Sequence, residues 1–285
     1  MTLLGAAEVR RLAAAEDIRP SKARGQNFVV DGNTIRRIVR LAELPGEGPV
    51  LEVGPGLGSL TLGLLDAGHD VVAVEVDRRL AAVLPETVMR LSPDRAEQLR
   101  VITADALTLD STGGNPVALV ANLPYNVAVP VLLHCLVEFP SIQRCLVMVQ
   151  LEVADRLAAS PGSKAYGVPS VKTAWFGRAT RVGTVAPAVF WPVPRVDSGL
   201  IRIDCAPPPA TSISRAAVFH MIDLLFAQRR KMIRATLGSA FGRIPAAEAL
   251  QQTDIDPTAR PEDLELTDFC RLAESISEAT GSSLE

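Results

Sequence analysis

The feature that most constrains this 285-residue chain is a regular alternation of short apolar segments with helix-like segments between residues 50 and 159. The apolar segments lie at residues 50–53, 71–76, 99–102, 117–121 and 145–149. Strands that alternate with helices imply a parallel sheet with helices on both faces, joined by right-handed crossovers. We expect residues 180–185 and 199–203 to add further strands at the edge of this sheet, and the chain to be an α/β protein.

The two ends of the chain differ from this central pattern. Residues 1–25 are expected to form a helical lead-in that ends near Pro20, and residues 31–43 have apolar positions at a helical period. The proline-rich run CAPPPATS at 205–212 is typical of a domain boundary, and the residues beyond it have helical patterns only. The sequence therefore predicts one domain over residues 1–207 and a small helical domain over residues 208–285.

The composition excludes several classes of protein. No run of about 18 apolar residues is present, so no membrane span is expected. The four cysteines form no CxxC pair and the three histidines have no metal-ligand spacing, so we expect a reduced, cytoplasmic protein without a metal site. The net charge of −3 argues against a surface that is basic throughout, although a local basic patch remains compatible with it.

A glycine-rich loop follows the first expected strand and has the sequence Gly54-Pro55-Gly56-Leu57-Gly58. Glycine lets the backbone turn sharply and come close to a ligand. A dinucleotide site would need the spacing GxGxxG, whereas the spacing here is GxGxG, and Pro55 removes one amide that could face a pyrophosphate. The loop therefore favours a cofactor without a diphosphate, which is typical of a methyltransferase rather than a dinucleotide oxidoreductase.

Acidic residues follow the next two strands. Glu75 lies at the end of the second strand, where its two oxygens can accept hydrogen bonds from ribose hydroxyls, and Asp77 is the alternative ligand nearby. Asp105 lies just past the third strand, where a carboxylate can accept from the amino group of an adenine. Its alternative role is a helix cap.

The end of the fourth strand carries the residues Asn122-Leu123-Pro124-Tyr125. An amino group conjugated to a base is a poor nucleophile because its lone pair is delocalised into the ring. The Asn122 side-chain oxygen and the Pro124 backbone oxygen can both accept from such a group and localise the lone pair. Tyr125 offers a flat face on which a flipped base can stack. This combination indicates methylation of an exocyclic amino nitrogen, most simply adenine N6.

The order and spacing of these motifs resemble the small-subunit rRNA adenine dimethyltransferases of the KsgA/RsmA type. The resemblance covers nearly the whole chain. It rests on GQNFVVD (25–31), EVGPGLGSLT (52–61), VVAVEVD (71–77), ITADAL (102–107), NLPYNVAVPVLL (122–133), MVQLEVADRL (148–157), VFWPVPRVDSGL (189–200) and FAQRRKMIRATL (226–237). It implies a seven-stranded, Rossmann-like class I methyltransferase domain that uses S-adenosylmethionine, and a small all-α C-terminal domain.

The resemblance also implies roles for individual residues. The cofactor would contact Gln26, Asn27, Val29, Gly54, Gly56, Glu75, Asp105, Ala106 and Asn122. Residues 1–30 would fold over that cofactor. Asn122, Pro124 and Tyr125 would hold the target adenine, and Phe190 would be a second stacking wall. The implied reaction is dimethylation of two adjacent adenines near the 3′ end of 16S rRNA, within the immature small ribosomal subunit, and we expect a monomer.

A basic cluster lies in the expected C-terminal domain. If residues 218–237 form one helix, Arg230, Lys231 and Arg234 share a face and Arg229 lies at its edge. We interpret them as phosphate contacts, with a solvated charged face as the alternative. Lys22 and Arg24 are expected to extend the same phosphate-contacting surface.

Two other functions stay open for a sequence of this kind. A large-subunit rRNA adenine methyltransferase of the antibiotic-resistance type shares the fold and the chemistry, although its usual tetrad has isoleucine at the position of Leu123. A non-catalytic RNA-binding factor can use the same scaffold. The intact set of Gly54, Glu75, Asp105 and Asn122 favours an active enzyme.

Overall fold

The computed structural model describes residues 3–20 and 26–281. The chain forms two compact units, one with the residues up to 155 and residues 179–205, and one with residues 156–178 and those from 206 onward. The boundary expected at residue 207 stays a prediction, but the contacts group residues 156–178 with the C-terminal helices. Tyr166, Val171 and Trp175 explain this grouping, because their side chains belong to the apolar core of the helical unit.

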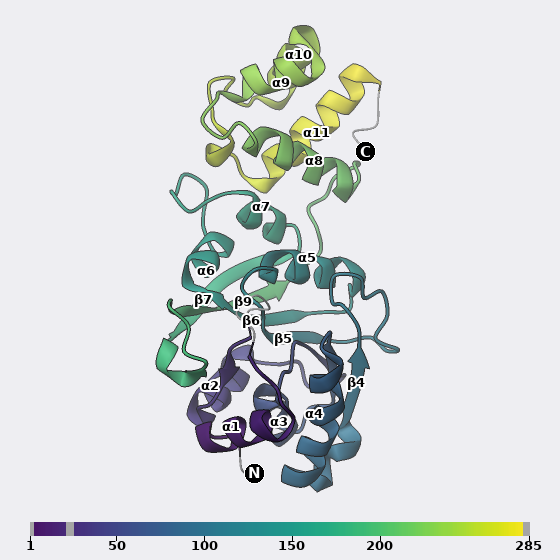
Figure 1. Ribbon diagram of the computed structural model, residues 1–285. Coiled ribbons are helices and arrows are strands. Elements are labelled where there is room, and N and C mark those ends of the chain that lie inside the picture. Colours follow the sequence, from purple (N-terminus) through teal and green to yellow (C-terminus); the bar gives the residue numbers. More distant parts are fainter. Residues whose placement is uncertain (1–2, 21–25, 282–285) are drawn as a thin grey trace. The chain divides into compact units, whose positions relative to one another are not determined.

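The first unit is built on one mixed sheet of seven strands in the order β4-β3-β2-β5-β6-β9-β7 (Figure 1). The strands are β2 (Val50–Val53), β3 (Val71–Glu75), β4 (Leu99–Thr103), β5 (Ala118–Asn122), β6 (Arg144–Gln150), β7 (Gly177–Val185) and β9 (Ser198–Cys205). The strands from β4 to β6 are parallel, and β9 runs antiparallel to β6. The α/β class and the two additional strands are confirmed, but only β7 lies at the edge, because β9 lies between β6 and β7.

The helices of this unit cover the sheet because their apolar faces need partners. They are α1 (Ala6–Ala15), α2 (Gly32–Ala42), α3 (Ser59–Asp66), α4 (Arg78–Leu91), α5 (Ala128–Glu138) and α6 (Leu151–Leu157). Figure 1 shows α5 on the opposite side of the sheet from α3 and α4. The strands β2 and β3 are buried along their whole length, as expected for strands covered on both faces. Their carboxyl ends, with that of β5, are the edge at which ligands bind in open α/β sheets.

A second, two-stranded sheet was not expected from the sequence. The strand β1 (Phe28–Val29) pairs antiparallel with β8 (Phe190–Trp191). One more hydrogen bond extends this pairing, from the Val30 N–H to the Val189 carbonyl at 2.8 Å. The rings of Phe28 and Trp191 stack with their centroids 6.3 Å apart. This small sheet attaches the segment before α2 to the segment that follows β7.

The second unit is helical. It contains α7 (Val168–Ala174), α8 (Arg215–Phe226), α9 (Ile233–Phe241), α10 (Arg243–Thr253) and α11 (Leu266–Thr280). The single helix expected over residues 218–237 was wrong, because α8 ends at Phe226 and α9 begins at Ile233. The residues between form turns, since the Ile233 N–H donates to the Ala259 carbonyl at 2.9 Å instead of to a helical partner. A tertiary contact here overrides helix propensity.

Candidate active site

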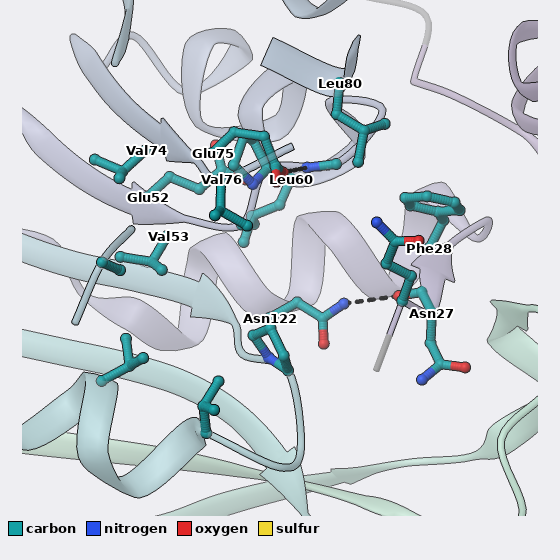
Figure 2. A pocket seen from close by; sticks show the side chains of 18 of the residues that line it. Asn27, Phe28, Glu52, Val53, Leu60, Val74, Glu75, Val76, Leu80 and Asn122 are labelled. Carbon is teal, nitrogen blue, oxygen red and sulfur yellow. Dashed lines mark hydrogen bonds between the residues drawn. The ribbon is translucent and has the colours of Figure 1, made fainter. Parts of the chain in front are cut away.

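A cavity of about 430 Å³ opens at the carboxyl ends of β2, β3 and β5 (Figure 2). All nine residues that the sequence assigned to a cofactor line this cavity, and Pro124 lines it too. They come from five separate segments, of which four follow strands of the parallel sheet and one, residues 26–29, belongs to the segment of the small sheet. A cavity of this size suits a ligand of the size of a nucleoside with one extra side chain.

The glycine-rich loop after β2 forms the floor of the cavity. Gly54 and Gly56 have φ values of +69° and +58°, a region that favours glycine. A Cβ atom on Gly54 would meet only Pro124 Cδ, at 4.0 Å, whereas one on Gly56 would lie 2.7 Å from the ring of Phe28. The absence of side chains therefore keeps space for a ligand at Gly54 and lets Phe28 pack closely on the loop at Gly56.

Glu75 is buried at the end of β3 with its carboxylate fixed by two backbone amides. Oε2 accepts from the Gly56 N–H at 3.2 Å and Oε1 accepts from the Asp77 N–H at 3.0 Å. Burial raises the pKa of Glu75, and these amides oppose that shift. Each oxygen keeps a further lone pair for a ribose hydroxyl. The alternative ligand, Asp77, caps α4 by accepting from the Arg79 N–H at 3.0 Å and does not line the cavity.

Asp105 and its apolar neighbours form another part of the wall. Asp105 Oδ1 accepts from the Leu107 N–H at 2.9 Å, which makes a local turn and fixes the side chain. Val76 also lines the cavity, and 62% of its side chain is exposed. Val76 and Asp105 therefore offer an apolar surface and a carboxylate in one cavity, a pair that suits an aromatic ring with an amino group. Sequence reasoning did not single out Val76, although an apolar residue directly after Glu75 was a usable signal.

A buried carboxyl group at Glu52 was also missed. Only 1% of Glu52 is exposed, and its Oε2 accepts from the hydroxyl of Thr61 at 2.7 Å. Burial raises the pKa of Glu52 to about 8, and the nearby Glu75 adds to the shift. Glu52 lines the cavity, so its wall contains a buried carboxyl group whose pKa is raised toward the physiological range.

Asn122 and Pro124 follow β5 at the mouth of the cavity. The Asn122 Nδ2 donates to the backbone carbonyl of Asn27 at 2.9 Å, and Figure 2 shows its Oδ1 turned away from Asn27. The Pro124 carbonyl accepts from the Val127 N–H at 3.1 Å, which uses one of its two lone pairs. Two oxygen acceptors therefore lie close together in the chain at the end of this strand.

The two expected stacking residues lie beside the cavity rather than in its lining. Tyr125 is half-buried, and its hydroxyl forms a 2.8 Å hydrogen bond with Ser198 Oγ, which fixes the ring. Burial raises the pKa of Tyr125, so the phenol stays protonated. Phe190 is 2% exposed and packs in the core below β1. The roles of Tyr125 and Phe190 in stacking stay predictions.

The basic residues expected to contact RNA differ in their surroundings. Arg230 and Lys231 are exposed in the turns after α8, and Arg234 is exposed in the first turn of α9. Arg229 is engaged with the protein, because its Nε donates to Glu262 at 2.6 Å and its guanidinium also donates to the Lys164 carbonyl at 3.1 Å. Lys22 and Arg24 lie outside the described residues.

The wall of the cavity fits S-adenosylmethionine by its donor and acceptor set. Glu75 supplies acceptors for a ribose, Asp105 supplies one for an adenine amino group, and the glycines leave room for the chain that carries the sulfonium. Residues 19–278 match the family model described as ribosomal RNA adenine dimethylase. The chain belongs to this family. As a ribosomal RNA adenine dimethylase, it is an enzyme that uses S-adenosylmethionine as its methyl donor and rRNA as its partner.

Relatives of this dimethylase are similar to it over almost their whole length. The "Ribosomal RNA small subunit methyltransferase A" of Kineococcus radiotolerans is 58% identical over 95% of this chain and 91% of that protein. The protein of the same name from Streptomyces griseus is 56% identical over 98% of this chain and 97% of that protein. The crystal structure of the 23S rRNA methyltransferase ErmE is 31% identical, covers 88% of this chain and 99% of ErmE, and has a TM-score of 0.66.

Within the described part of this dimethylase, no helix combines the length and the apolar character needed to cross a bilayer.

Proposed function

We propose that this chain transfers methyl groups from S-adenosylmethionine to N6 of two adjacent adenines near the 3′ end of 16S rRNA. The observation that carries the proposal is the 2.9 Å hydrogen bond from Asn122 Nδ2 to the Asn27 carbonyl. A carbonyl oxygen only accepts, so this bond sets the orientation of the Asn122 amide and leaves Oδ1 as an acceptor. An acceptor fixed before the substrate arrives is what methylation of an amino group needs.

Activation of the target adenine is the first role of these residues. The lone pair of N6 is delocalised into the ring, so the amino group attacks poorly. Asn122 Oδ1 and the Pro124 carbonyl accept its two N–H bonds, draw them out of the ring plane and localise the lone pair. Pro124 holds its carbonyl in place through the fixed φ of its ring and the bond from Val127.

Positioning of the two reactants is the second role. The bound cofactor supplies a methyl group on a positively charged sulfur. Glu75 and Asp105 would anchor the ribose and the adenine of the cofactor. Tyr125, fixed by Ser198, would hold the flipped base by stacking. Proximity and alignment then provide the rate without a covalent step through the protein.

The choice of the small subunit rests on the relatives. Proteins named small-subunit methyltransferase A are 58% and 56% identical to this chain, whereas ErmE, named as a 23S rRNA methyltransferase, is 31% identical. The tetrad also has Leu123 rather than isoleucine. The proposed substrate is the immature small subunit. The enzyme acts on it as a monomer in the cytoplasm, and its Arg230, Lys231 and Arg234 contact phosphates of the rRNA.

The test is transfer of labelled methyl groups to small subunits from a strain that lacks this modification, with large subunits as control. We expect N6,N6-dimethyladenine in small-subunit RNA only, and none with Asn122→Ala. Label in large subunits would overturn the substrate and favour the resistance-type reaction. Cofactor binding without any transfer would favour a non-catalytic role in assembly.

A further inference from the structure

The helical unit contains a second cavity, separate in sequence from the active-site residues. Its volume is about 760 Å³, and it lies between α9, α10 and the loop at residues 254–257. Ala246, Leu250 and Ile255 line it and are nearly fully buried, so they form an apolar floor. Of the residues with a role in the proposed function, only Arg234 lines this cavity, which we call the α9–α10 groove.

Two arginines lie at the rim of the groove. Arg234 and Arg243 both line it and are exposed, and neither forms a salt bridge within the described residues. Arg234 also interacts electrostatically with Asp256, so only Arg243 is without an acidic partner within the described residues. Guanidinium groups beside a cavity are suited to the phosphates of a nucleic-acid strand.

Two carboxylates also line the groove, and their surroundings differ. Asp256 is occupied by its own turn, since it accepts from the N–H and the hydroxyl of Thr258 at 2.8 Å each. Asp254, at the end of α10 with φ of +53°, has no hydrogen bond from its side chain within the described residues. A carboxylate accepts only, so Asp254 suits a ligand that presents N–H groups.

We propose that the α9–α10 groove binds one unpaired nucleotide of the rRNA. The base lies on the floor of Ala246, Leu250 and Ile255, and Arg234 and Arg243 contact the flanking phosphates. Asp254 accepts from the Watson–Crick edge of the base. Guanine presents two adjacent N–H donors there, whereas uracil presents one and two carbonyl oxygens, so the groove prefers guanine over uracil. Single-stranded recognition of this kind is the usual way in which proteins read RNA sequence.

The inference rests on the proposed function only in taking RNA as the partner. Asp254 would repel phosphates and the carboxylates of a protein partner alike, so the phosphates must lie on the side of Arg234 and Arg243 while the base faces Asp254. The neighbouring Arg230 and Lys231 are also exposed, so the local charge favours a polyanion.

The test measures binding of short single-stranded RNA oligonucleotides to the full chain by fluorescence anisotropy at several salt concentrations. We expect Arg243→Ala to weaken binding and reduce the slope of log K against log salt by about 0.7, the value for one phosphate on a single strand. We expect Ala247→Glu, which places a negative side chain at a residue that lines the groove, to weaken binding at least as much. The matched controls are Arg260→Ala and Ala216→Glu, at exposed positions outside the groove.

Base preference gives a second readout. Oligonucleotides that differ by guanine or uracil at one position should bind differently to the wild type and equally to Asp254→Leu. Cofactor affinity, measured in parallel, should stay the same in all groove variants, which separates a failure of this proposal from a failure of the methyltransferase assignment. An unchanged salt slope in Arg243→Ala, an equal loss in the control variants, or the absence of a guanine preference would overturn the proposal. So would loss of binding to whole small subunits with intact binding to RNA, because it would assign the groove to a protein.

Discussion

Asn122, at the end of β5, donates its side-chain amide to the backbone carbonyl of Asn27, 95 residues earlier in the chain. The residue proposed to activate the substrate is therefore oriented by the segment that lines the cofactor cavity. The bond also makes the amide nitrogen of Asn122 as important as its oxygen, because a carboxylate in its place would meet the Asn27 carbonyl acceptor to acceptor.

Replacement of Asn122 tests this relationship. If only an acceptor oxygen mattered, Asn122→Asp would keep much of its activity. We expect instead that Asn122→Asp and Asn122→Ala both lose about 100-fold or more in single-turnover methyl transfer, the usual effect of removing one preorganised polar group. The control is Asn115→Ala, at an exposed loop position. Near-normal transfer by Asn122→Asp would contradict the orienting role of Asn27.

Glu75→Gln should weaken cofactor binding. The substitution keeps the shape of the side chain but places an amide where two backbone N–H groups now meet a carboxylate. Loss of a charged acceptor corresponds to about 1.5 to 3 kcal/mol, or roughly 10-fold to 100-fold in affinity by calorimetry. Glu86→Gln, on the exposed face of α4, is the matched control. Equal affinities for the two variants would remove Glu75 from the site.

Gly56→Ala should destabilise the protein more than Gly68→Ala. Both glycines have positive φ, so each alanine introduces about 1 to 2 kcal/mol of backbone strain. Only at Gly56 would the new Cβ also collide with the Phe28 ring, at 2.7 Å, whereas nothing lies within 4 Å at Gly68. The two free energies of unfolding in urea give the difference, and Phe28→Ala should remove most of it in a double-mutant cycle. Equal destabilisation by Gly56→Ala and Gly68→Ala would show that the Phe28 ring moves aside without a cost in free energy.

The raised pKa of Glu52 should make the free energy of unfolding depend on pH. Its pKa is raised to about 8 in the folded chain, against about 4.5 for an ordinary glutamate. Between these values the folded state holds a proton that the unfolded state has lost, so stability falls as the pH rises from about 4.5 to about 8. Each pKa unit corresponds to about 1.4 kcal/mol. We expect the free energy of unfolding of Glu52→Gln, measured with denaturant and without cofactor, to rise relative to that of the wild type as the pH increases across this range. Parallel curves for the two proteins would contradict the burial of a protonated carboxyl group.

Substitutions of the basic residues near α9 should have two different effects, one on RNA affinity and one on the melting temperature. Neutralisation of Arg230, Lys231 and Arg234 should reduce RNA affinity and the salt slope but leave the melting temperature nearly unchanged, because all three are exposed. Arg229→Ala should mainly lower the melting temperature, since the guanidinium holds Glu262 and the Lys164 carbonyl. A large change in the salt dependence of RNA binding in Arg229→Ala would show that this residue contacts RNA after all.

The sequence predicted the sheet and much of the cavity because both depend on local signals. Buried parallel strands are continuous apolar runs, and the residues that follow them at Gly54, Glu75, Asp105 and Asn122 must meet at one edge of the sheet. The cavity-lining residues at 26–29 were identified by the family resemblance rather than by periodicity.

The parts that were missed depend on contacts between distant residues. The break between α8 and α9 follows from the bond of Ile233 to Ala259, and the pairing of β1 with β8 joins segments about 160 residues apart. Each of these strands has two residues, too short to produce a period. The raised pKa of Glu52 depends on burial, which single-sequence patterns do not report for a charged residue.

The small sheet of β1 and β8 has an energetic consequence for the cavity wall. Phe28 and Val29 are held by a short ladder and by the Ser59 hydroxyl on the Val29 carbonyl, not by the seven-stranded sheet. Segments with few long-range hydrogen bonds open with a fraction of the global free energy. The amides of residues 28–30 should therefore exchange with solvent deuterium far sooner than those of β5 and β6. This exchange proceeds by a local opening that exposes the ligand site while the strands of the central sheet stay paired.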